Sequence, residues 1–285
     1  MKNLKKYLLA SLVSLSIISC SEDSIPVAND VTLEFNNTFG ATTIVLGDAT
    51  STDATVNTSA EGQVHHFEEL KYVISNIRLI NAEGNEFAYN TQNLDEGATV
   101  VNQSKPETLQ YVLTNIPTAD YTQIKFGLGV KSDLNTLNEE SFPIFYAAAG
   151  ENDTEMHWEW GTGYRFTKIE GFYGADNADL SIHTGSTLDE DPNGGEAYVQ
   201  GVNAYRDITL DLTTNAEVGS SSPKITIKAD FDKLLSAATN TITLSSNNAT
   251  PSIHHAGNMV LVVDNIGGNG DTDINGMFSI ESVEN

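Results

Sequence analysis

A long succession of short stretches rich in β-branched and aromatic residues, separated by clusters of Asn, Asp, Gly, Ser and Thr, constrains this fold most. Such segments with frequent turn signals are typical of β-sandwiches and barrels. Apolar and polar residues alternate strictly in 124–130 and 208–212, as expected of half-buried strands. We predict strands at 31–35, 42–46, 70–80, 86–89, 109–113, 123–130, 164–173, 180–182, 205–212, 224–229, 241–244, 259–263 and 276–280.

The expected fold class is therefore all-β, with a single β-sandwich-like domain over residues 31–285, long loops and one short helix. The helix is predicted at 230–238, capped by Asp230, from four apolar residues at helical spacing: Phe231, Leu234, Leu235 and Ala238. The long loops are 47–63, 131–155 and 185–203, and long loops on β scaffolds often carry function. We find no fixed-period repeat and no linker that divides the domain.

The N-terminus has the features of an export signal. Residues 1–19 contain three lysines, an apolar run over 7–18 and the small residue Ser19 before Cys20. The run is shorter than the roughly 20 residues that span a bilayer. Residues 17–20 (IISC) resemble a lipobox, in which Cys20, the single cysteine of the chain, is lipidated; an ordinary cleaved signal with a chance cysteine is the alternative. We expect a signal peptide at 1–19 and a lipidated tether at 20–30.

The tether begins with the acidic sequence SEDS at 21–24, which resembles the export signals of Bacteroidetes-type surface lipoproteins; a plain solvated tether is the alternative. The expected location is thus outside the cytoplasm, lipid-anchored to the outer membrane, on its periplasmic or its outer face. Contact with the membrane is expected through the lipid anchor only.

The mature chain is strongly acidic. Without Lys2, Lys5 and Lys6, 11 basic residues stand against 39 acidic ones, a net charge of about −28. Such a charge repels nucleic acid and anionic lipid and makes cations the natural partners. Acidity also keeps exported proteins soluble, so it does not by itself indicate a metal protein.

Several segments resemble the MbnP-like family of copper-associated exported proteins, and together they cover about residues 31–280. The most specific is 156–164 (MHWEWGTGY), followed by 168–171 (KIEG). The others are 72–79 (YVISNIRL), 116–117 with 120–121 and 124–130, 182–185 (IHTG) and, more loosely, 277–280 (MFSI).

The resemblance implies a β-rich exported domain that binds copper through histidines, with a role in metal acquisition or handling. In some relatives a tryptophan is oxidised to kynurenine by a dihaem peroxidase-type partner. The implied partners are the copper ion, such a dihaem protein and an outer-membrane transporter.

Histidine is the expected metal ligand, because imidazole suits Cu(II) and the domain has no cysteine. A lone histidine is more often a hydrogen-bonded structural residue than a ligand. Position within a matched segment favours His157 and His183 as ligands. His66 and His255 come next, and His65 and His254 are expected to be their neighbours only.

Trp158 and Trp160 are the candidates for a modified tryptophan, with core packing as the alternative. If 156–160 is a regular strand, His157 and Glu159 face one side and the two tryptophans the other, because side chains alternate along a strand.

Two strings, 189–194 and 271–276, spell D-x-D-x-N-G, which spaces oxygen ligands for calcium around a glycine turn. The final Glu of a twelve-residue calcium loop is missing from both, and polar turns produce such strings easily. The calcium candidates are Asp189, Asp191, Asn193, Asp271, Asp273 and Asn275.

No nucleophile elbow, HExxH sequence, P-loop or complete G-x-G-x-x-G is present, and we expect a binding protein that is not an enzyme. Two alternatives stay open. One is a surface binding module for a glycan, peptide or protein partner without metal chemistry, and the other is a metallohydrolase.

Overall fold

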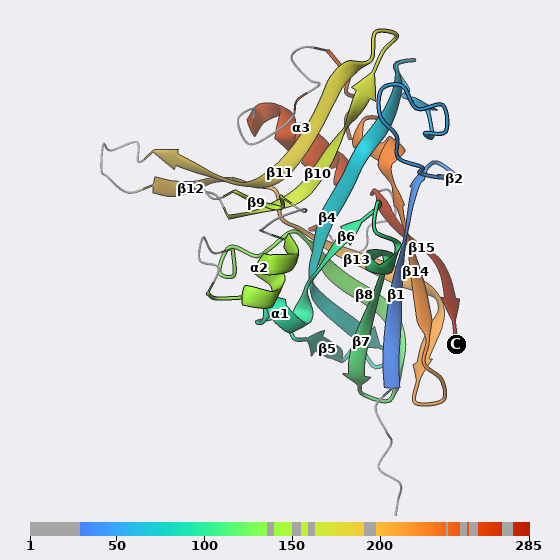
Figure 1. The fold of residues 1–285 in the computed structure, drawn as a ribbon. Coiled ribbons are helices and arrows are strands. Elements are labelled where there is room, and N and C mark those ends of the chain that lie inside the picture. The colour runs from blue at the N-terminus through green and yellow to red at the C-terminus, as the bar shows by residue number, and fades with distance from the viewer. Residues whose placement is uncertain are drawn as a thin grey trace, which may run out of the picture.

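The computed structural model describes residues 29–285 apart from 136–139, 150–154, 159–162, 191–197, 238, 246–249, 251–255 and 270–275. Two β-sheets pack face to face in the described part of the chain (Figure 1). The predicted signal peptide, Cys20 and most of the tether lie outside the described residues.

The smaller sheet has the strand order β15-β14-β1-β2, and β7 also pairs with β1. β1 and β14 run parallel, and the other pairs are antiparallel. Its strands are β1 (Asn29–Phe39), β2 (Thr42–Thr43), β7 (Gln110–Ile116), β14 (Lys224–Asp230) and β15 (Phe278–Glu284).

The larger sheet is antiparallel, with the order β12-β11-β10-β4-β8-β13, and shorter strands pair with β4 and β10. β4 is the long central strand, and β11 with β12 forms an edge hairpin, on the left of Figure 1. The strands are β3 (Asn57–Thr58), β4 (Val64–Asn81), β5 (Glu86–Tyr89), β6 (Thr99–Asn102), β8 (Ala119–Leu128), β9 (His157–Trp158), β10 (Gly163–Tyr173), β11 (Ala178–Glu190), β12 (Tyr198–Asn203) and β13 (Arg206–Val218).

The main core lies between the two sheets. Alternate residues of β1, β4 and β8 face inward, and Phe35, Tyr72 and Phe126 are almost fully buried there. Aromatic edges meet ring faces between the two sheets, as in the contact of Phe126 in β8 with Phe278 in β15, at 5.2 Å between ring centroids. Because each buried aromatic ring stabilises the fold by roughly 2 kcal/mol, this layer is the main source of folding free energy.

Helices cover the large sheet from both sides. α1 (Leu94–Gly97) and α2 (Pro143–Ala149) lie in front of β4 and β6, and α3 (Ala256–Ile266) lies behind β10 and β11 in Figure 1. Two 3₁₀ turns, Pro106–Leu109 and Phe231–Leu234, complete the described secondary structure. No helix of the described residues is long and apolar enough to cross a membrane.

The all-β, β-sandwich-like prediction is confirmed, but the expectation of one short helix is wrong. The predicted helix at 230–238 is only the 3₁₀ turn Phe231–Leu234, although Asp230 caps it by accepting a bond from the Asp232 amide. α3 occupies the predicted strand at 259–263. The buried residues of α3 recur at helical spacing: Met259, Val262, Val263 and Ile266. The prediction considered only the short apolar run 259–263, which by itself cannot be told from a strand.

Two of the three predicted long loops contain regular secondary structure. α2 forms inside 131–155, and β11 and β12 occupy most of 185–203. No strand forms at 241–244, where only an isolated bridge joins Ser236 and Thr241.

Candidate metal centre

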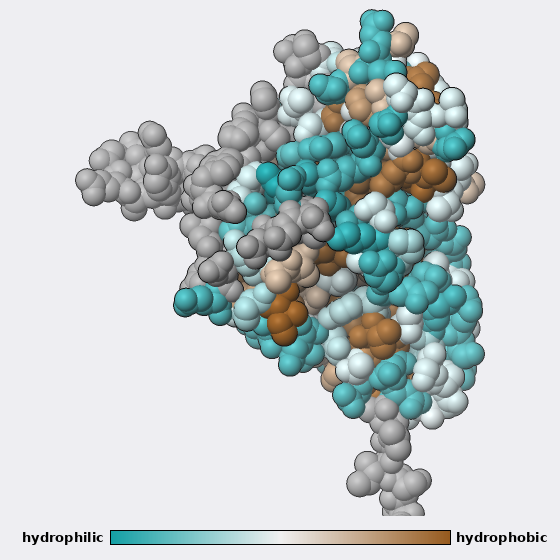
Figure 2. All heavy atoms as spheres, in the orientation of Figure 1, coloured by the Kyte–Doolittle hydropathy of each residue, from teal (hydrophilic) through white to brown (hydrophobic). Residues whose placement is uncertain are grey.

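The outer face of β4, β10 and β11 carries a cluster of charged and polar side chains. In the strand register, Lys168 of β10 stands between His183 of β11 and Lys71 of β4, and Glu170 stands between Ser181 and Glu69. Because residues alternate along a strand, these side chains share one face, while the intervening Ile169 and Ile182 enter the core. Figure 2 shows hydrophilic residues gathered over this part of the sheet.

His183 and Glu170 form a hydrogen-bonded pair on this face. The distance from Nε2 of His183 to Oε1 of Glu170 is 2.9 Å, and Ser181 Oγ lies 3.3 Å from the same nitrogen. The bond from His183 is the main reason that the pKa of Glu170 falls to about 2. In the tautomer that donates from Nε2 to this carboxylate, Nδ1 keeps the lone pair that a metal ion needs.

Trp158 lies against β11, at Gly185. A β-carbon on Gly185 would be 2.5 Å from Cζ3 of the indole, so the ring rests on the backbone of β11. Gly185 is two residues after His183 and therefore on the same face of the strand. The Arg165 guanidinium stands 4.8 Å from the ring centroid, and the indole is only 4 % exposed.

His157, the neighbour of Trp158, lies in a different environment. Its ring meets those of Tyr146 and Tyr164, with centroid distances of 5.1 Å and 4.8 Å, and is 6 % exposed. His157 and Trp158 thus have separate surroundings, as alternation along a strand requires. The structure does not bring His157 and His183 together.

His66 shares the outer face with His183 but lies further along it. Its register partner is Phe172, on which its ring packs, and its Nε2 lies 3.3 Å from the Asp48 carbonyl oxygen. Phe172 is four residues from Lys168, the partner of His183, which is roughly 13 Å along a strand. Two ligands of one ion lie within a few ångströms of each other, so His66 and His183 do not form a common site in this arrangement.

The remaining candidates lie mostly outside the described residues. His255, Trp160, Asp191, Asn193, Asp271, Asp273 and Asn275 belong to that group. The backbone of Asp189 lies in β11, where it pairs with Val199 rather than standing in a turn. Among the described residues, no three His, Cys, Asp or Glu side chains form a group that could hold a metal ion.

The charged residues around Lys168 were missed in the sequence analysis. The Lys168 ammonium lies 2.9 Å from Glu69 Oε2 and 2.6 Å from Glu155 Oε2, and Lys71 forms an ion pair with Glu69. Arg165 donates to the Glu155 carbonyl oxygen. The alternation of Lys168 and Glu170 in the predicted strand would have indicated a shared face, but the contributions of β4 and of Glu155 depend on tertiary structure.

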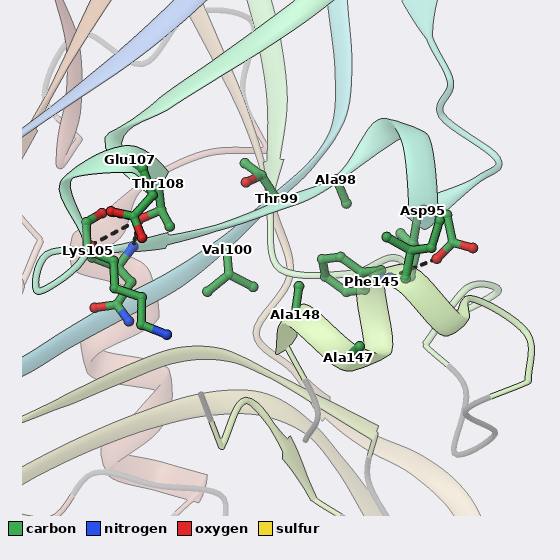
Figure 3. A pocket seen from close by; sticks show the side chains of 13 residues that line it. Asp95, Ala98, Thr99, Val100, Lys105, Glu107, Thr108, Phe145, Ala147 and Ala148 are labelled. Carbon is green, nitrogen blue, oxygen red and sulfur yellow. Dashed lines mark hydrogen bonds between the residues drawn. The ribbon is translucent and has the colours of Figure 1, made fainter. Parts of the chain in front are cut away.

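The described surface has two hollows near the large sheet. A polar one of about 420 Å³ reaches the pair through Glu170 and is lined by Leu46, Glu68, Glu69, Lys71, Asn102, Ser104 and Glu170. The other, of about 440 Å³, lies between α1, β6, the 3₁₀ turn Pro106–Leu109 and α2. Figure 3 shows Phe145, Val100 and Ala148 along this second hollow, with Lys105 toward one end.

The segment 72–79 is structural. Tyr72 donates to Asn37 at 2.8 Å, Ser75 to the Gly129 carbonyl oxygen at 2.6 Å, and Asn76 to the Tyr205 hydroxyl at 2.8 Å. Arg78 forms an ion pair with Asp207. These interactions join β4 to β1, to Gly129 just after β8 and to β13, so the segment stabilises the fold and does not position the metal candidates.

Comparison with known proteins supports the family resemblance. The MbnP family model matches residues 28–255. The solved structure of MbnP from Methylosinus trichosporium superimposes with a TM-score of 0.56 at 14 % identity, covering 89 % of this chain and 98 % of that one. No curated protein matches the chain in sequence. Because the family model spans well over half of the sequence, the chain belongs to the MbnP family.

Proposed function

We propose that this protein is an exported lipoprotein that binds copper through histidine on the outer face of β10 and β11, and that it serves in metal acquisition or handling. The observation that carries the proposal is the His183–Glu170 pair at 2.9 Å, on the strand against which the Trp158 indole packs two residues further on, at Gly185. Family membership supports a copper-related role.

The chemistry of the pair suits a metal-binding histidine. A carboxylate that accepts a bond from one ring nitrogen fixes the tautomer and the ring orientation, and it makes the other nitrogen a better ligand. His183 is 16 % exposed at its side chain, so an ion can reach it from solvent. Glu170 supplies negative charge directly beside the imidazole, whereas Glu69 in the polar hollow is already paired with Lys71 and Lys168.

One imidazole does not make a complete copper site. His157 and His66 are not placed beside His183, and His255 lies outside the described residues. We therefore propose His183 as the anchoring ligand, and we keep His255 as the next candidate on its position in the sequence alone.

The test is a copper titration of protein purified from its own host, with the bound metal measured directly. We expect His183→Ala to lose at least about tenfold in copper affinity, and His157→Ala, whose ring faces Tyr146 and Tyr164, to serve as the matched control. A metal-to-protein ratio near zero in wild-type protein, or equal affinities in wild type and His183→Ala, would contradict the proposal.

We also propose that Cys20 carries the lipid anchor and that the protein is a binding protein without catalytic activity. Cys20→Ser is expected to yield unlipidated protein in the soluble fraction, measured with labelled lipid. Membrane retention of the Cys20→Ser protein after a salt wash would argue against the anchor.

A second candidate function is the binding of a glycan or peptide without metal chemistry. The hollow between α1 and α2 favours it. Its walls combine apolar residues with a few polar ones, as ligand pockets do: Leu94, Ala98, Val100, Phe145, Lys105 and Glu107. Hydrogen exchange of the exported protein with candidate glycans or peptides tests it. Metal-independent protection of residues 94–108 would support this function.

A further inference from the structure

The hollow between α1, β6, the 3₁₀ turn Pro106–Leu109 and α2 has the size and the walls of a ligand pocket. Its volume is about 440 Å³, and ligand pockets typically span roughly 300–1,000 Å³. Ile144, which borders it, is 68 % exposed, so apolar surface also surrounds the opening. Apolar side chains form most of the wall: Leu94, Ala98, Val100, Ile144, Phe145, Ala147 and Ala148.

The two ends of this hollow differ in charge. Lys105 is the one basic side chain among the described residues that line it, and it stands at one end (Figure 3). Its ammonium forms no ion pair with a described residue, and Glu107 at the same end is exposed. At the other end, Asp95 accepts a hydrogen bond from the Phe145 amide at 2.8 Å and so holds α2 against α1. An anionic ligand group is therefore expected at the Lys105 end.

The edge of β6 offers main-chain hydrogen bonds to a ligand in this hollow. The Asn102 amide donates to Thr108 Oγ1 at 2.9 Å, and its carbonyl oxygen accepts from the Lys105 amide at 2.9 Å, so both groups point away from β4. Main-chain groups alternate in direction along a strand, and those of Val100 therefore point the same way. No described residue bonds to these Val100 groups, and Val100 lines the hollow. An extended peptide can pair with such an edge.

We propose that this hollow binds the free C-terminus of an apolar peptide. The terminal carboxylate lies at Lys105, the peptide main chain runs beside Val100, and the apolar side chains pack against α2. This inference goes beyond the proposed copper function and rests on the second candidate function, which it narrows to one ligand class. Peptides that pair with a strand edge gain affinity from main-chain bonds and specificity from pockets for alternate side chains. The charge of Lys105 favours a peptide carboxylate over an uncharged glycan.

The experiment is a calorimetric titration of the full-length protein, in the presence of EDTA, with the N-acetylated tetrapeptide AVAL as free acid and as C-terminal amide. We expect wild type to bind the acid at least about fivefold more tightly than the amide, because the amide lacks the charge that Lys105 recognises. Lys105→Met should bind both peptides equally, and Lys105→Arg should keep the preference. Glu107→Gln should bind the acid more tightly than wild type, because it removes a like charge from this end.

The matched control is Lys224→Met, which removes the same charge from the smaller sheet. Lys224 is paired there with Glu34 and Glu284, and this variant is expected to titrate like wild type. Hydrogen exchange reports where the peptide binds, and the acid should protect the Val100 amide in wild type. If Lys105→Met is not recovered folded, Lys105→Gln takes its place.

Three results would each overturn the inference: no binding of the acid by folded wild type, equal affinities for acid and amide, or a preference that survives in Lys105→Met. Protection of the hollow by cellotetraose, an uncharged glycan, without binding of the acid would also overturn it and leave the second candidate function standing. Because EDTA withholds copper, the copper titration of His183→Ala decides the proposed copper function separately.

Discussion

The indole of Trp158 rests on Gly185 so closely that a β-carbon there would lie 2.5 Å from Cζ3. Gly185→Ala therefore forces the ring away from β11. We expect a loss of roughly 1–3 kcal/mol in unfolding free energy, as for other overpacked sites, with a shift in tryptophan fluorescence. Gly257→Ala, which meets no atom within 4 Å, is the control. Equal stability and unchanged fluorescence in both variants would show that Trp158 does not depend on this glycine.

The bond between His183 and Glu170 predicts an acid-sensitive fold. The pKa of Glu170 is about 2, below the ordinary 4.5, chiefly because of this bond. A depressed carboxyl pKa contributes stability above pH 4.5, and that contribution is lost as the pH falls from 4.5 toward 2. We expect Glu170→Gln to flatten the decline in urea-unfolding free energy within this window. His183→Ala should flatten it in part, and a slope unaltered by either change would contradict the assignment.

His65 gives a second pH dependence at a higher pH. It is fully buried beside Phe39 and Phe67, and burial lowers its pKa below 6.5. Below pH 6.5 the unfolded chain then binds a proton that the folded chain resists, so stability falls as the pH drops. The slope for this one proton is at most about 1.4 kcal/mol per pH unit. His65→Phe is expected to remove it in denaturant titrations between pH 7.5 and 5, and persistence of the full slope would refute the prediction.

The main sheet strands could be predicted from sequence because alternation such as that of Ile124, Phe126 and Leu128 directly reflects burial on one face. α3 could not, since its helical spacing became clear only over the whole stretch from Met259 to Ile266. The sequence indicated His183 as a candidate because it lies in the matched segment 182–185, but it did not indicate Glu170 as its hydrogen-bond partner. Glu170 meets His183 through strand pairing, and pairing depends on contacts far apart in the chain.

Gly163 combines two constraints. Its φ is +80°, which side chains other than glycine rarely adopt, and a β-carbon would collide with Asn135, whose Oδ1 accepts from the Tyr164 amide at 2.8 Å. We expect Gly163→Val to lower the thermal midpoint more than any single histidine change. Gly62→Val, with φ +76° but no neighbour within 4 Å, isolates the backbone strain. A midpoint for Gly163→Val equal to that of Gly62→Val would remove the steric part of the argument.

The two tryptophans are predicted to differ if one is oxidised to kynurenine. Trp158 is 4 % exposed and lies under the Arg165 cation, which disfavours removal of electrons from the indole. An external oxidant, such as a dihaem peroxidase-type partner, would therefore modify Trp160 rather than Trp158. Mass spectrometry of the tryptic peptide 132–165 from host-purified protein locates any kynurenine, with protein made in a different host as the control. Kynurenine at Trp158 would show that the Arg165 contact does not protect it, whereas two intact tryptophans in copper-loaded protein would leave metal binding to histidine alone.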